Sequence, residues 1–145
     1  MISDEGNVYN VIDSLIVCKF SRGTYYDGTK DLANYYTLAT GIPMTPEELT
    51  KSGERIENLA RLFNIREGKG TREFDTLPWK IKNCPVPDEG PAKGVVVNEE
   101  EFQIGLDDYY AVRGWTPDGI PTPGKLAELD LGDLNYIAQK AQGGA

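Results

Sequence analysis

Apolar residues recur at spacings of three and four along most of the chain, which is the pattern of helices that bury one face. It is clearest over residues 4–15, where the apolar positions are Val8, Val11, Ile12 and Leu15. Similar patterns predict further helices over residues 31–40, 45–64, 98–113, 122–129 and 133–142. In the helix over residues 45–64 the apolar residues predict one buried face, formed by Leu49, Ile56, Leu59, Leu62 and Phe63. The charged residues of that helix fall mainly on the solvated face, namely Glu54, Arg55, Glu57 and Arg61. We therefore expect a mainly α fold, an irregular helical domain of about four to six helices.

Several of these helices have recognisable ends. Thr45 is followed by Pro-Glu-Glu48, which is a capping-box start with proline in the first turn. Asn98 precedes three glutamates, an N-cap whose acidic residues suit the positive end of the helix dipole. Gly41 and Gly114 follow the last apolar positions of their helices, where a C-terminal glycine commonly stops a helix.

Residues 65–97 lack periodicity because four glycines and four prolines interrupt them, and we name this segment the Pro/Gly-rich arm. A compact domain rarely keeps so long an irregular segment unless the segment binds something or covers a partner. Trp79, Ile81 and Cys84 are apolar anchors that predict an arm lying along a surface. We expect one helical domain over residues 1–142, with residues 143–145 as a tail.

Charge and composition exclude several classes of protein. The 145 residues carry a net charge of −8 with no dense basic cluster, which argues against nucleic-acid binding. No apolar run approaches the ~18 residues that a membrane span needs. The first five residues are acidic and unlike a secretory signal, and two cysteines without a disulfide framework are typical of a reducing, cytoplasmic setting.

The sequence contains no histidine. This removes Ser-His-Asp and Cys-His catalysis, histidine metal sites and the usual proton carrier near neutral pH. Any chemistry must come from carboxylates, a thiolate, tyrosines or a cofactor shared with another polypeptide.

Cys18 is the first candidate for such chemistry. It follows the first predicted helix and precedes Lys19, and a thiol beside a cation can be held as the thiolate that iron–sulfur clusters bind. Asp13, at the end of the helix, could accept hydrogen bonds from a polar ligand. The alternative is that Cys18 is a small buried apolar residue, the usual fate of a free cysteine.

The segment from Asp13 to Phe20, Asp-Ser-Leu-Ile-Val-Cys-Lys-Phe, resembles the D-x-x-G-L-C-K-F segment of the aldehyde:ferredoxin oxidoreductase family. The chain departs from this pattern at Ile16, where the family usually has glycine, a residue that allows a positive φ. The resemblance continues in the same order through five later segments and spans residues 7–131. These segments are Asn64–Gly68, Asp75–Pro78, Gly90–Gly94, Asp107–Trp115 and Asp118–Leu126.

The resemblance implies the third, mostly helical domain of these enzymes, which closes over pterin cofactors. It implies that Asp13, Val17 and Cys18 bind cofactor and that Cys18 is the fourth ligand of a [4Fe–4S] cluster. The family's C-x-x-C-x-x-x-C cluster ligands and its glutamate–histidine active-site pair lie upstream and are not in this sequence.

The implied function is that of a C-terminal part or split subunit of a tungstopterin (or molybdopterin) and iron–sulfur aldehyde oxidoreductase. Such an enzyme converts an aldehyde and water to a carboxylic acid and passes electrons to ferredoxin. The implied partners are the N-terminal domains or a partner subunit, ferredoxin and the aldehyde. We expect the isolated chain to be inactive and cofactor-free, with an apolar surface formed by Ile16, Val17, Tyr25 and Tyr26. The alternative is a non-catalytic acidic helical binding module or a truncated paralogue.

Overall fold

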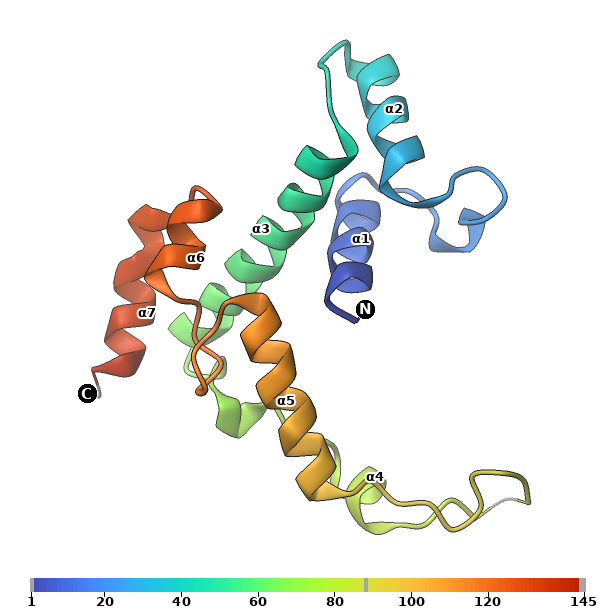
Figure 1. Ribbon diagram of the computed structural model, residues 1–145, viewed down its shortest axis with the longest axis vertical. Helices are drawn as coiled ribbons and strands as arrows, with labels where there is room; N and C mark the ends of the chain where they lie inside the picture. Colours follow the sequence, from blue (N-terminus) through green and yellow to red (C-terminus); the bar gives the residue numbers. More distant parts are fainter. Residues whose placement is uncertain (1, 88, 144–145) are drawn as a thin grey trace.

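The computed structural model describes residues 2–87 and 89–143, and 64% of these residues are helical (Figure 1). Within the described residues there are two isolated β-bridges but no strand, so the mainly α prediction is confirmed. Six of the seven helices are the predicted ones, and the additional helix is the short α4. The helices are α1 (Ile2–Ser14), α2 (Gly28–Thr40), α3 (Pro46–Arg66), α4 (Trp79–Asn83), α5 (Glu99–Arg113), α6 (Pro123–Glu128) and α7 (Asn135–Gln142).

The predicted helix ends are present. Thr45 Oγ1 accepts from the Glu48 amide at 3.2 Å while the Glu48 carboxylate accepts from the Thr45 amide at 2.8 Å, which completes the capping box. The Asn98 side chain accepts from two amides of the first turn of α5. Gly41 and Gly114 end α2 and α5 with φ of 72° and 68°. Local sequence signals therefore define most of the secondary structure.

The long helix α3 organises the molecule, because α1 and α2 pack against one end of it and α7 against the other (Figure 1). Two clusters of buried side chains result. The N-terminal cluster is Val11, Ile12, Tyr26, Leu32, Ala33 and Leu49. The C-terminal cluster is Leu62, Ile65, Ile120, Leu126, Leu129, Leu131, Ile137 and Ala138.

The buried face of α3 differs from the single apolar stripe that we predicted. Leu59 and Phe63, expected inside, are 48% and 54% exposed, whereas Gly53 and Asn58 are buried. Five helical residues turn by about 140° beyond one full turn, so Gly53 and Asn58 point to different sides of the helix. The helix thus buries one side near α1 and another side near α6 and α7. A pattern that assigns one apolar face to the whole helix cannot predict burial where the helix packs against different elements along its length.

Helix α1 crosses α3 very closely. A Cβ atom added at Gly53 would lie 2.2 Å from the backbone oxygen of Asn7, so only glycine fits this crossing. Arg113 of α5 is 2% exposed and fixes the same helix by donating hydrogen bonds to the Asn7 side chain and the Ser3 carbonyl. Helix α1 is therefore held from two sides.

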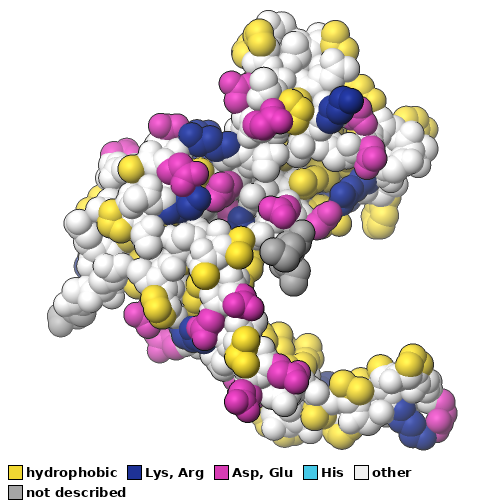
Figure 2. Space-filling view, viewed as in Figure 1, with side chains coloured by type: hydrophobic (Ala, Val, Ile, Leu, Met, Phe, Trp, Pro, Cys, Tyr) yellow, Lys and Arg dark blue, Asp and Glu magenta, His cyan; other side chains and the backbone are white. Residues whose placement is uncertain are grey.

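The Pro/Gly-rich arm divides into two parts. Residues 65–75 lie along the body, where the Arg72 amide donates to the Asp118 carbonyl at 2.9 Å. Residues 76–97, which we name the outer arm, include α4 and extend away from the body (Figures 1 and 2). The prediction that the whole segment lies along a surface is therefore wrong for its outer part, because few groups of the body contact it.

The assignment of residues 1–142 to one domain stays a prediction. Helix α7 ends at Gln142, and two of the three tail residues, 144 and 145, lie outside the described residues. None of the helices in the described ranges is long and apolar enough to span a membrane.

Candidate functional site

The loop after α1, residues 15–27, contains the predicted site and is called the Cys18 loop. Helix α1 stops through two backbone hydrogen bonds, from Ile16 to the Asp13 carbonyl (3.2 Å) and from Val17 to the Ile12 carbonyl (3.0 Å). These are the two bonds of a Schellman motif, in which the residue after the helix takes a left-handed conformation. Here that residue is Ile16, with φ of 58°.

Ile16 thus occupies the backbone conformation that glycine takes at little cost. A left-handed conformation costs a non-glycine residue about 1–2 kcal/mol, and β-branched residues are especially unsuited to it. The position where the resembled motif has glycine is therefore one at which the backbone of this chain takes a left-handed conformation. Glycine would fit this conformation without strain.

Cys18 is exposed, which contradicts the alternative that it is a core residue. Its carbonyl oxygen accepts from the Ser21 hydroxyl (2.6 Å), the Ser21 amide (3.1 Å) and the Tyr26 hydroxyl (3.2 Å). The backbone of Cys18 is fixed by these three donors while its thiol is open to solvent. Such a thiol can reach a group presented from outside the chain.

Asp13 and Lys19 flank the thiol and form an ion pair of 2.9 Å, with side chains that are 63% and 45% exposed. The Lys19 ammonium group also lies 5.1 Å from the centre of the Tyr9 ring. Exposed ion pairs contribute little to stability, about 0–1 kcal/mol, and are readily exchanged. The Asp13 carboxylate could therefore accept from a ligand at small energetic cost.

Large apolar side chains of the Cys18 loop are exposed. Ile16, Phe20 and Tyr25 are 92%, 98% and 73% exposed. The predicted surface is confirmed for Ile16 and Tyr25, but it is wrong for Tyr26, which is 3% exposed in the N-terminal cluster. Val17 is half-buried against the same cluster, and its amide donates to the Ile12 carbonyl, so its backbone carbonyl is the group that it could offer to a ligand.

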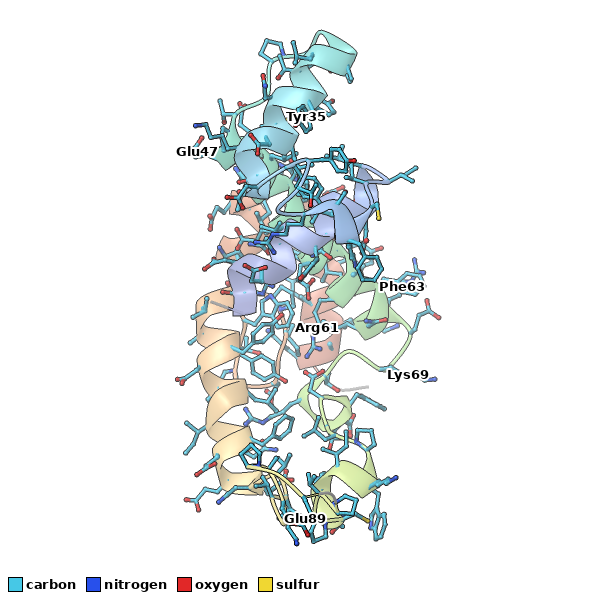
Figure 3. The ribbon with its side chains drawn as sticks, turned by 90° about the vertical axis from the view of Figure 1, so that its right-hand side faces the viewer. Tyr35, Glu47, Arg61, Phe63, Lys69 and Glu89 are labelled. Atoms are coloured by element: carbon cyan, nitrogen blue, oxygen red, sulfur yellow. The ribbon has the colours of Figure 1, made fainter. Side chains whose placement is uncertain are left out.

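A second polar site lies between α3, α5 and residues 74–76, where five of the twelve residues that line a cavity of about 390 Å³ are aromatic. Arg61, labelled in Figure 3, lines this cavity and donates from both terminal nitrogens to Asp75, at 2.9 and 2.6 Å. Its Nε donates to the Gly119 carbonyl at 2.8 Å, and its guanidinium group lies 4.8 Å from the Trp115 ring. The Tyr110 hydroxyl also donates to Asp75. We name these five residues the Arg61 network.

The charges of the Arg61 network balance one another. Burial raises the pKa of Asp75, but hydrogen bonds from Arg61 and Tyr110 outweigh burial and place this pKa below its usual value. Burial and the hydrogen bond to Asp75 raise the pKa of Tyr110 to about 12. Because each charged group already has its partner, this network stabilises the fold and offers no free group for chemistry.

The prediction that Arg61 lies on a solvated face is wrong, since its side chain is only 10% exposed. Periodicity could not reveal this network, because its members come from segments far apart in the chain. The family resemblance, however, did contain a signal for this network. Three of the resembling segments, Asp75–Pro78, Asp107–Trp115 and Asp118–Leu126, meet at this point.

Within residues 2–87 and 89–143, no three cysteine, aspartate or glutamate side chains gather as metal ligands. Cys84, the second cysteine, follows α4 in the outer arm and is partly buried. A [4Fe–4S] cluster takes four thiolates. The exposed Cys18 thiol could supply one of these four ligands, and the described residues do not bring three others to it.

Comparison with known proteins agrees with this arrangement. The family profile described as aldehyde ferredoxin oxidoreductase, domains 2 and 3, matches residues 1–131. The tungsten-containing aldehyde ferredoxin oxidoreductase of Pyrococcus furiosus is 40% identical over 124 residues, which are 86% of this chain and 20% of the relative. The corresponding Thermococcus kodakarensis enzyme is 37% identical over 124 residues, with the same shares covered.

A more distant relative is the aliphatic sulfonate oxidoreductase, WOR-like subunit, of Pyrococcus furiosus, at 29% identity over 126 residues. Among solved structures, the active-site complex BamBC of benzoyl coenzyme A reductase, bound to 1,5-dienoyl-CoA, has a TM-score of 0.73 at 26% identity. The similarity covers 95% of this chain and 19% of that one.

The chain spans about a fifth of the length of these relatives and matches a C-terminal part of the tungsten enzymes. The match over residues 1–131, the 40% identity and the shared fold all concern the same helical region. The chain belongs to the aldehyde ferredoxin oxidoreductase family.

Proposed function

We propose that this chain is the C-terminal part of a tungstopterin and iron–sulfur aldehyde oxidoreductase and that the Cys18 loop contacts both cofactors. The observation that carries the proposal is the exposed Cys18 thiol, which follows a left-handed turn at Ile16 that glycine would adopt at little cost. A buried Cys18 thiol, or a different backbone conformation at Ile16, would not have allowed contact with a cofactor.

Each residue of the site has a defined task. Cys18 supplies one thiolate to a [4Fe–4S] cluster, and the hydrogen bonds to its carbonyl oxygen hold it in position. Asp13 exchanges its exposed bond with Lys19 for hydrogen bonds from the pterin. The backbone of Val17 lies between them and contacts the pterin, while its side chain keeps the loop attached to the N-terminal cluster.

The bound metal–pterin centre, with tungsten or molybdenum, would supply the oxidation of an aldehyde and water to a carboxylic acid, two electrons and two protons. The cluster would carry these electrons to ferredoxin in the cytoplasm. This chain contributes ligands and shape to that reaction, which is the usual share of a protein in cofactor chemistry. Three further thiolates and the rest of the active site come from the N-terminal part of the enzyme.

The test is co-expression of this chain with the N-terminal four-fifths of the Pyrococcus furiosus relative, followed by electron paramagnetic resonance and iron analysis of the purified complex. We expect Cys18→Ala to remove or convert the [4Fe–4S] signal and to lower the iron content, because one of four thiolates is lost. Cys84→Ala is the matched control and leaves both unchanged.

An unaltered cluster signal in Cys18→Ala would overturn the proposal. A chain that forms no complex at all would instead support the alternative, a non-catalytic acidic helical module or a truncated paralogue. The isolated chain is expected to remain colourless after anaerobic reconstitution, which absorbance alone can establish.

A further inference from the structure

The outer arm, residues 76–97, exposes more apolar surface than a segment facing only water would keep. Trp79 is 73% exposed at the start of α4, and all described residues from Pro85 to Val96 are exposed. Scattered apolar residues are normal on a surface, but a contiguous group marks an interaction site. The exposed large apolar residues of the outer arm are Trp79, Ile81, Val86, Val95 and Val96, which are 39–73% exposed.

The outer arm nevertheless has a defined shape. Val86 and Val95 are joined by an amide–carbonyl bond of 3.1 Å, and Gly94 donates to Val86 at 2.9 Å. At the base, Lys82 pairs with Glu99 of α5 at 2.8 Å. An apolar segment that is held in one conformation without a core of its own is prepared for a partner, because little ordering entropy remains to be lost on binding.

The region that carries the outer arm is similar to part of a much longer protein. Similarity to the BamBC chain covers 95% of this chain, which leaves about seven of 145 residues outside it. The similar region therefore includes most of the 22-residue outer arm, and it is only 19% of that longer chain. In that protein, the region is attached to a large further body.

The outer arm and the Cys18 loop project from the same side of the molecule. In Figure 1 both extend to the right, the loop above and the arm below, and Figure 2 shows a hollow between them. Figure 3 views the molecule from this side, with Glu89 of the arm at the bottom and Arg61 between the two projections. One body placed in the hollow would touch both.

The charge of the outer arm indicates which surface would fit it. The sequence of the outer arm contains three lysines and two acidic residues, Asp88 and Glu89, so its net charge is +1. The whole chain, by contrast, has a net charge of −8. Lys80 is exposed beside Trp79 and has no ion-pair partner among the described residues. A matching surface is an apolar pocket for the Trp79 ring with a carboxylate at its rim.

We propose that the outer arm is a second docking surface, occupied by the N-terminal four-fifths of the enzyme, with the Trp79 indole in an apolar pocket edged by acidic side chains. This proposal rests on the proposed function in one respect, namely that the N-terminal part of the enzyme is the partner of this chain. The partner is then held at two separated points, the Cys18 loop and the arm, on either side of the hollow.

The test uses the complex with the N-terminal four-fifths of the Pyrococcus furiosus relative. We expect Trp79→Ala to raise the dissociation constant at least about tenfold, since buried tryptophans are frequent hot spots of interfaces. Tyr136→Ala is the control: Tyr136 is 62% exposed on α7, away from the arm, and the dissociation constant should change less than about twofold. Circular dichroism of both free variants checks that the helices are retained.

Hydrogen exchange gives a second readout. The amides of Val86, Gly94 and Val95 should exchange more slowly in the complex, while those of α7 keep their free rates. Equal binding by Trp79→Ala with an intact Cys18-dependent cluster would overturn the arm proposal and leave the proposed function standing. Self-association of the free chain that Trp79→Ala abolishes would also overturn it, because the occupant would then be a second copy.

Discussion

The Cys18 loop and the Arg61 network contain similar residues in opposite situations. Each has an acidic and a basic residue beside aromatic rings. Around Arg61 these groups are mostly buried and bonded to one another, whereas around Cys18 the charges and Phe20 face the solvent. Polar groups that satisfy one another hold the fold together, and those left open are available to a partner.

The contrast also separates two kinds of family resemblance. The first segment, ending in Cys18-Lys-Phe20, lies on the surface around an exposed thiol. The later segments supply Asp75, Tyr110 and Trp115 to an internal network. A resemblance motif therefore indicates a ligand site only when the fold leaves its polar groups free.

The largest expected effect is that of Arg61→Ala. This change leaves the Asp75 carboxylate without its cation in a mostly enclosed site, which should lower the free energy of unfolding by about 3–5 kcal/mol. Arg66→Ala is the control on the same helix, because Arg66 pairs with Glu67 while both are more than half exposed, and should cost below about 1 kcal/mol. Urea unfolding measures the free energy of unfolding of both variants. Equal losses would show that the enclosed Arg61–Asp75 pair contributes no more than the exposed Arg66–Glu67 pair.

A smaller effect is expected at alkaline pH. The pKa of Tyr110 is raised from 10.0 to about 12, so folding favours the neutral phenol. The resulting stability is fully present below pH 10 and is lost as the pH rises towards 12, and we expect it to be at most about 2 kcal/mol. Tyr110→Phe should reduce this part of the pH dependence, as monitored by thermal unfolding. An identical profile in both proteins would contradict the hydrogen bond to Asp75.

The smallest change in stability is expected for Ile16→Gly, and it is an increase rather than a loss. Glycine relieves the left-handed strain, and little burial is lost because Ile16 is 92% exposed, so stability should rise by about 0.5–1 kcal/mol. Ile104→Gly is the matched control: Ile104 is 56% exposed within α5, and there glycine should lower stability by about 0.5–1 kcal/mol. Thermal unfolding of both variants decides, and losses at both positions would show that Ile16 is unstrained.

Helices with local start and stop signals could be predicted from the sequence. Thr45 with Glu48 and Asn98 with its glutamates determine their own caps, so the beginnings of α3 and α5 needed no tertiary information. The position of Cys18 just after α1 could likewise be predicted, because it depends only on where that helix ends.

Burial was less predictable wherever it depended on distant segments. Arg61 is enclosed because Asp75 and Gly119 reach it from other parts of the chain, which no helical period records. The buried side of α3 changes between Gly53 and Asn58 for the same reason. The outward course of the outer arm was also missed, since Trp79 would serve equally well as an anchor on this chain or on another.

The attachment of α1 to α5 has a consequence for the order of folding. Arg113 bonds to Asn7 and Ser3 across separations of 106 and 110 residues, so the hydrogen bonds that fix α1 join the most distant parts of the chain. Contacts of such long range form late, because the loop between them must first be closed. During synthesis, α1 could pack against α3 before residue 113 emerges, but its bonds to Arg113 would form only afterwards. The helix that leads into Cys18 would therefore be fixed in two steps, first by α3 and then by α5.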